Sequence, residues 1–230
     1  MTTSAGDVVF IQAIALGIDP EWRRRPEASR AEDLASFVTA EIAAVEDEVH
    51  SELYSSIGLE PGVDLILWRW ASTVDVLERA GARTLRSGLG AWSRIRDVFL
   101  ACTAPSQYAA KPSSQERGLL TGERSRYLIV YPFTKSTDWH LTSREERQKV
   151  MNEHMKLGHQ YPSVRQALGY SFGLDDQDFL VAYETDDLVA FGDLVRDLRG
   201  TESRRATVRD TPILLGIRRT PAELADLLGA

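Results

Sequence analysis

Two similar stretches, Gly58-Leu59-Glu60-Pro61-Gly62-Val63-Asp64-Leu65-Ile66 and Gly173-Leu174-Asp175-Asp176-Gln177-Asp178-Phe179-Leu180, decide the fold of this 230-residue chain. In each, a Gly-Leu pair opens a polar turn, and an aspartate then precedes the apolar residues of an expected strand. This internal repetition predicts that one supersecondary unit occurs twice in the chain.

The segments around each stretch predict the same element order, βαββαβ. Capping-box spacing at Ser29-Arg30-Ala31-Glu32 and again at Ser143-Arg144-Glu145-Glu146 indicates the first helix of each unit. The expected strands are 8–16, 49–57, 63–70 and 95–103 in the first unit, and 126–133, 164–172, 178–184 and 207–215 in the second. The second helices are expected at 73–86 and 188–198.

Each unit matches the ferredoxin-like split βαβ arrangement, an antiparallel sheet with helices on one face. The predicted class is therefore α+β: two fused ferredoxin-like repeats whose sheets curl together into a dimeric α+β barrel. We expect an N-terminal half at 1–104, an inter-repeat loop at 105–125 that is rich in Pro and Ser, and a C-terminal half at 126–230. The chemically capable residues lie in the C-terminal half, so we expect the site there.

The composition narrows the class of protein. A formal charge of −7 argues against nucleic acid as a partner, because phosphate-binding surfaces carry a basic excess. The single cysteine, Cys102, excludes an intrachain disulfide and favours a reducing compartment. No apolar run approaches the ~20 residues of a membrane span, and no signal peptide is recognisable. We therefore expect a cytoplasmic protein with no membrane partner.

A candidate site begins at Tyr131-Pro132-Phe133-Thr134-Lys135 and continues through Trp139 and His140 to His154. A phenol, an ammonium and an imidazole on adjoining elements suit an iron porphyrin, with Tyr131 redox-capable, Lys135 reaching a propionate and His154 ligating iron. The alternative is a half-buried aromatic beside a solvated lysine, with Trp139 and His140 capping a core.

His154 shares a helical stripe with Val150, Met151 and Leu157, so it projects with the apolar face of its helix. A lone histidine there can equally be a hydrogen-bonded core residue. A metal-binding histidine needs an acceptor at its second nitrogen, and we expect Glu202 to supply it. Gln166, on the strand after the helix, is a further inward-facing candidate, because a buried amide needs a polar partner.

The chain resembles the chlorite dismutase-like family and, within it, the coproheme decarboxylase branch. The resemblance spans nearly the whole chain. The matching residues are Tyr131-Pro132-Phe133-Thr134-Lys135, Asp138-Trp139, Met151-Asn152-Glu153-His154, Gly173-Leu174-Asp175-Asp176-Gln177-Asp178-Phe179 and Asp210-Thr211-Pro212, together with Asp19-Pro20-Glu21-Trp22, Leu67-Trp68-Arg69 and Pro105-Ser106-Gln107-Tyr108 in the first half.

The resemblance implies a role for each matching side chain. His154 corresponds to the proximal iron ligand and Glu202 to the acid that holds it. Tyr131 corresponds to the radical-forming tyrosine, and Lys135 to the lysine beside the reacting propionate. Gln166 falls where chlorite dismutases carry an arginine, which disfavours chlorite chemistry because a fixed cation for an anionic oxidant is missing.

The implied activity is the hydrogen peroxide-dependent decarboxylation of Fe-coproporphyrin III (coproheme) to heme b through a tyrosyl radical, in a homopentamer. Coproheme would be both substrate and cofactor, and Trp139, Arg117 and Ser203 are further candidates for porphyrin contacts. His140 and Ala206 depart from residues common in the family, and His140 has no assigned role. Two alternatives stay open: a chlorite dismutase- or peroxidase-like heme b enzyme, and a non-catalytic heme-binding protein.

Overall fold

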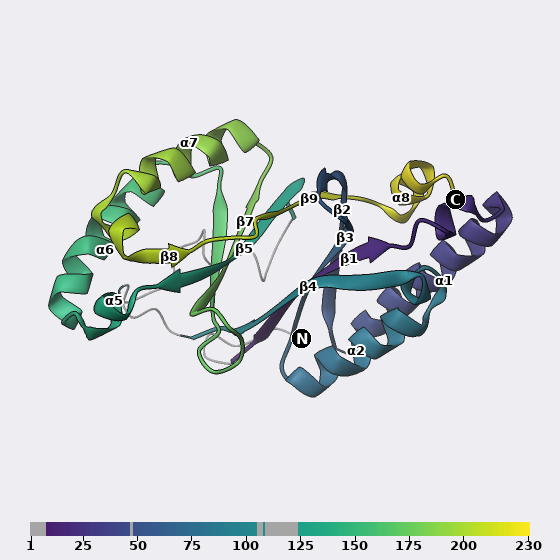
Figure 1. The fold of residues 1–230 in the computed structure, drawn as a ribbon, viewed down its shortest axis with the longest axis horizontal. Helices are drawn as coiled ribbons and strands as arrows, with labels where there is room; N and C mark the ends of the chain where they lie inside the picture. The colour runs from purple at the N-terminus through teal and green to yellow at the C-terminus, as the bar shows by residue number, and fades with distance from the viewer. Residues whose placement is uncertain (1–7, 47, 105–107, 109–123) are drawn as a thin grey trace. The chain divides into compact units, whose positions relative to one another are not determined.

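The computed structural model describes residues 8–46, 48–104, 108 and 124–230, and the chain divides into two compact units (Figure 1). The first unit contains residues 1–102 together with 214–230, and the second contains residues 103–213. Most of the predicted inter-repeat loop, 105–107 and 109–123, lies outside the described residues. Among the described residues, no helix combines the length and the apolar character needed to cross a bilayer.

The first unit follows the predicted βαββαβ order. Its strands pair antiparallel in the spatial order β4-β1-β3-β2, with β9 beside β2. The elements are β1 (Phe10–Ile18), η1 (Trp22–Arg24), α1 (Glu27–Glu46), β2 (His50–Glu60), β3 (Val63–Ala71), α2 (Val74–Arg86), α3 (Gly88–Ala91), β4 (Ser93–Cys102), β9 (Leu214–Arg218) and α8 (Pro221–Leu228).

The second unit repeats this order, with strands paired antiparallel as β6-β7-β5-β8. Counted within each unit, both sheets have the strand order 4-1-3-2, so the predicted ferredoxin-like repeat is confirmed. The elements are β5 (Tyr127–Lys135), α5 (Thr137–Leu141), α6 (Arg144–Gly158), β6 (Arg165–Tyr170), β7 (Phe179–Thr185), α7 (Leu188–Arg199), η2 (Glu202–Ala206) and β8 (Thr207–Arg209).

The glycines of the two matching stretches have the same backbone conformation. Gly58 and Gly173 both have φ of +73°, a left-handed conformation that glycine adopts without steric cost. In the second unit the capping box is also confirmed, because Ser143 accepts from the Glu146 N–H and the Glu146 carboxylate accepts in return. These local signals therefore account for the turn at Gly173 and the start of α6, whereas Gly58 lies near the end of β2 and the turn that follows it is at Pro61-Gly62.

Apart from small shifts at strand ends, three features differ from the sequence prediction. Helix α1 begins at Glu27 rather than after Ser29, directly behind Pro26, whose fixed φ suits a helix start. The strand expected at 207–215 is divided into β8 and β9, and Pro212, which has no N–H for a ladder, lies between them. The C-terminal half predicted to run to residue 230 is also shorter, because residues 214–230 belong to the first unit, where β9 pairs with β2.

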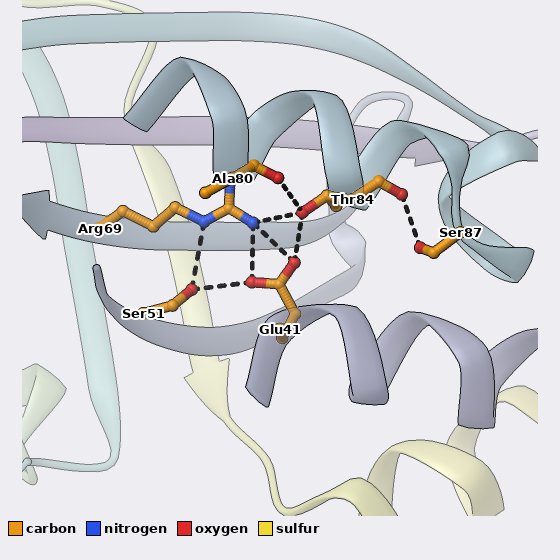
Figure 2. Close-up of polar contacts among 6 residues, drawn as sticks. All are labelled: Glu41, Ser51, Arg69, Ala80, Thr84 and Ser87. Carbon is orange, nitrogen blue, oxygen red and sulfur yellow. Dashed lines mark hydrogen bonds and ion pairs between the residues drawn. The ribbon is translucent and has the colours of Figure 1, made fainter. Parts of the chain in front are cut away.

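The first unit contains a buried ion pair that joins its two long helices to the sheet (Figure 2). Arg69, on β3, is completely buried, and its Nη2 donates to both carboxylate oxygens of Glu41 on α1 at 2.6 and 2.7 Å. The same nitrogen donates to Thr84 on α2 at 2.6 Å, and the Arg69 Nε donates to Ser51 on β2 at 3.2 Å. A buried guanidinium requires such partners, so these contacts fix α1 and α2 against one face of the sheet.

Candidate functional site

A cavity of about 220 Å³ lies within the second unit, bounded by strands β5, β6 and β7 and by helices α5, α6, α7 and η2. It brings together seven of the nine side chains that the sequence singled out. These are Tyr131, Lys135, Trp139, His140, His154, Gln166 and Ser203. Arg117 lies outside the described residues, and Glu202 does not line the cavity.

Strand β5 supplies three of the lining side chains through its alternation. Tyr131, Phe133 and Lys135 are two residues apart and therefore point to the same face of the sheet, into the cavity. Tyr131 is 9% exposed, and burial, followed by the neighbouring Tyr183, raises its pKa well above the usual value of 10. A hydrogen bond joins the two phenols, and their rings stack with centroids 6.0 Å apart. Tyr131 therefore retains its phenolic proton at neutral pH.

Lys135 is held at the cavity wall by contacts on several sides. Its Nζ donates to the backbone oxygen of Ser203 at 2.7 Å and to Thr207 Oγ1 at 3.4 Å, and it lies 4.7 Å from the ring centroid of Trp139. Burial, followed by the charge of Arg204, lowers the pKa of Lys135 to about 8. An ammonium has three N–H donors, so Lys135 can give a further hydrogen bond to an anion in the cavity.

His154 projects from α6 into the cavity with one ring nitrogen already bonded. Its Nδ1 lies 3.1 Å from Ser203 Oγ. Burial, followed by the charge of Lys135, lowers the pKa of His154 to about 4, so the imidazole is neutral at pH 7. A neutral imidazole is the protonation state that binds metals.

A chain of hydrogen bonds fixes which nitrogen of His154 carries the proton. The hydroxyl of Thr201 donates to the Leu198 carbonyl at 2.7 Å, so its oxygen accepts from the Ser203 hydroxyl at 3.0 Å. Because the Ser203 proton is used in that bond, Ser203 Oγ accepts from the His154 Nδ1–H. The lone pair of His154 therefore lies on Nε2, where it is available to a ligand in the cavity.

The predicted contact between Glu202 and His154 is wrong in this structure. The Glu202 side chain is 59% exposed and accepts from Arg205 Nε at 2.9 Å, whereas Ser203 is buried and contacts the histidine. Both residues begin the short 3-10 helix η2, where consecutive side chains point in different directions. The partner of the His154 Nδ1–H is therefore the neutral hydroxyl of Ser203 rather than the predicted carboxylate of Glu202.

Two further predicted residues, Gln166 and His140, line the cavity from β6 and α5. Gln166 lines the cavity from β6, while its neighbour Arg165 points away and donates to Glu184 at 2.8 Å. His140, on α5, places its Nε2 3.1 Å from Asp178 Oδ2, an oxygen that also accepts from the Lys135 backbone N–H. His140 and Gln166 therefore give the cavity polar groups without formal charge when the histidine is neutral.

Four charged residues that line the cavity had no role predicted from the sequence: Arg147, Arg199, Arg204 and Asp210, the last of which belongs to a stretch that matches the family. Together with Lys135, the three arginines give four cations. Asp210 is the one carboxylate among the lining residues that the structure describes, and it pairs with Arg204. A cavity with this excess of positive charge favours an anionic ligand. Tyr183, also missed, could have been found from its strand alternation with Val181, which also lines the cavity.

Comparisons with known proteins agree with this architecture. The family described as chlorite dismutase matches residues 27–219. A coproheme decarboxylase of Mycolicibacterium smegmatis is 34% identical over 167 residues, 72% of this chain and 71% of the relative. A chlorite dismutase of Ideonella dechloratans is 26% identical over 216 residues, 90% of this chain and 75% of the relative.

A solved chlorite dismutase from Candidatus Nitrospira defluvii, in complex with imidazole, has a similar structure. Its TM-score is 0.86 at 25% identity, covering 96% of this chain and 95% of that one. The likeness confirms the α+β class that the repeated units predict. The chain belongs to the chlorite dismutase family.

Proposed function

We propose that the protein is a heme-dependent enzyme that converts coproheme to heme b with hydrogen peroxide. The observation that carries the proposal is the shared cavity, in which a protonated Tyr131, a cationic Lys135 and a neutral His154 meet. The similarity to a coproheme decarboxylase supports it. The homopentameric assembly stays a prediction from the resemblance, and the cytoplasmic location stays a prediction from the composition.

The donor set fits an iron porphyrin. His154 would hold the iron through its Nε2 lone pair, which the bond from its Nδ1–H to Ser203 keeps directed into the cavity. The apolar wall, which includes Met151, Leu198 and Val195, would hold the porphyrin ring, and the cationic residues would bind its carboxylate arms. When bound, the iron porphyrin supplies the oxidising power that peroxide delivers.

The chain's own residues account for the handling of the propionate arm. Lys135 would donate to the carboxylate and hold the arm near β5. Tyr131 lies four residues earlier on the same strand and lines the same cavity. Tyr131, once oxidised and deprotonated, takes a hydrogen atom from the arm, which returns the tyrosine to its phenol. The arm then loses one further electron and carbon dioxide, and a vinyl group remains.

The reaction balances for each arm: a propionate, one hydrogen peroxide and one proton give a vinyl group, carbon dioxide and two waters. The arm is oxidised by two electrons, and the peroxide is reduced by two. Tyr131 is regenerated in each cycle, so it acts as a relay and is not consumed. Two cycles convert the four carboxylates of coproheme into the two of heme b.

The test is to load purified protein with ferric coproheme, titrate hydrogen peroxide, and identify the porphyrin by chromatography and mass spectrometry. We expect a three-carboxylate porphyrin followed by heme b, and neither product from the Tyr131→Phe variant. An unchanged or bleached porphyrin from the wild-type protein would refute the proposal. Turnover that survives Tyr131→Phe would instead favour a peroxidase- or chlorite dismutase-like enzyme.

A further inference from the structure

Arg147 lines the cavity without an assigned role. It lies in the first turn of α6 and shares one stripe of the helix with Met151 and His154, at positions i, i+4 and i+7. All three side chains line the cavity. The Arg147 Nε is buried and has no hydrogen-bond partner among the residues that the structure describes.

An unbonded N–H on a buried guanidinium nitrogen indicates a missing acceptor. Such a group is costly to bury, because it has given up its hydrogen bonds to water and gained none in return. The lining residues that the structure describes include one carboxylate, Asp210, and its Oδ2 already accepts from Arg204 Nη1. The acceptor that suits the planar guanidinium best is a carboxylate, which can bind two of its N–H groups side by side.

We propose that Arg147 binds a carboxylate arm at the rim of the porphyrin whose iron His154 ligates. The inference rests on the proposed function and adds a specificity-determining contact to it. Seven residues of α-helix span about 10.5 Å along the axis, and both side chains lean towards the N-terminus, so their separation stays of this order. This separation is comparable with the reach from the centre of a porphyrin to a carboxylate on its rim.

The position of Arg147 also separates its role from that of Lys135. Lys135 extends from β5 and is bonded to the Ser203 backbone beside His154, whereas Arg147 lies two helical turns away from that histidine. The two cations would therefore contact different carboxylate arms of the ligand. Arg147 anchors the rim and orients the ring, and this orientation decides which arm reaches Lys135 and Tyr131.

The test measures porphyrin binding without iron, so that it does not depend on ligation or turnover. Metal-free coproporphyrin III and its tetramethyl ester are titrated into wild-type protein, Arg147→Leu and Arg147→Lys, following quenching of tryptophan fluorescence, since Trp139 lines the cavity. Lys149→Leu, an exposed position on the same helix, is the matched control.

We expect Arg147→Leu to weaken binding of the acid roughly 10- to 100-fold and to leave binding of the ester unchanged, because one charge-assisted contact is lost. Arg147→Lys should retain part of the affinity, and Lys149→Leu all of it. Equal affinity of wild type and Arg147→Leu for the acid would overturn the role of Arg147 while leaving the porphyrin site intact. Failure of the wild-type protein to bind either compound would overturn the proposed function and this contact with it.

Discussion

Replacing Ser203 by alanine should weaken binding of iron porphyrin, whereas replacing Glu202 by glutamine should not. In the structure the His154 Nδ1–H donates to Ser203 Oγ at 3.1 Å, while the Glu202 carboxylate is exposed and paired with Arg205. Ser203→Ala removes the acceptor but keeps the Ser203 backbone oxygen that Lys135 uses. The imidazole then loses the bond that fixes its orientation and its tautomer.

The expected magnitude follows from the loss of one hydrogen bond behind a metal-binding histidine. Such partners are typically worth about 10- to 100-fold in metal affinity. We therefore expect Ser203→Ala to raise the dissociation constant of ferric coproheme by about that factor, and to leave that of metal-free coproporphyrin III within about twofold of wild type. Glu202→Gln should match wild type for both compounds.

The assay is a titration of each variant with ferric and metal-free porphyrin, followed by Soret absorbance and fluorescence quenching. A selective loss for the iron compound identifies an effect on ligation rather than on the shape of the cavity. If Glu202→Gln weakened iron porphyrin binding and Ser203→Ala did not, the hydrogen-bond assignment derived from the structure would be refuted. The acid inferred from the family resemblance would then be the true partner.

Three further results are expected. Because the pKa of His154 is lowered to about 4, the unfolded chain takes up a proton between pH 6.5 and about 4 that the folded chain does not. The free energy of unfolding of the apoprotein should therefore fall by up to about 3 kcal/mol as the pH is lowered over that range. Urea unfolding of His154→Gln should not show this pH-dependent loss. Glu41→Gln should destabilise the protein by about 3–5 kcal/mol in urea unfolding, because it leaves the buried Arg69 charge unpaired, while Glu21→Gln at an exposed pair should cost less than about 1 kcal/mol. A bound carboxylate should raise the lowered pKa of Lys135. Calorimetry at pH 8 in buffers of different ionisation enthalpy should therefore show that protons are taken up when coproporphyrin binds. This proton uptake should be smaller in Lys135→Met.

The sequence predicted the repeated order of elements correctly because its signals are local and occur twice. The apolar run that ends at Tyr131 predicted β5, and the capping box at Ser143 predicted the start of α6. Gly58 and Gly173 share a left-handed conformation ahead of the equivalent strands β3 and β7. Such features depend on neighbouring residues, so the order of elements could be predicted.

The details that failed depend on contacts between distant segments. Neither helical nor strand periodicity applies to the short η2, so the sequence could not decide whether Glu202 or Ser203 faces α6. The sequence alone does not distinguish Arg147 from a solvent-exposed arginine in the first turn of a helix, because the cavity that it lines is formed by several distant segments. The pairing of β9 with β2 joins residues more than 150 positions apart, and no short-range pattern encodes it.

The central claim is tested most directly by the stoichiometry of a reaction with limiting hydrogen peroxide. Coproheme-loaded protein is mixed with less than one equivalent of peroxide, and the carbon dioxide released is measured against the peroxide consumed. The account predicts one carbon dioxide per peroxide for the wild-type protein and none for Tyr131→Phe. Consumption of peroxide by the wild-type protein without release of carbon dioxide would contradict it.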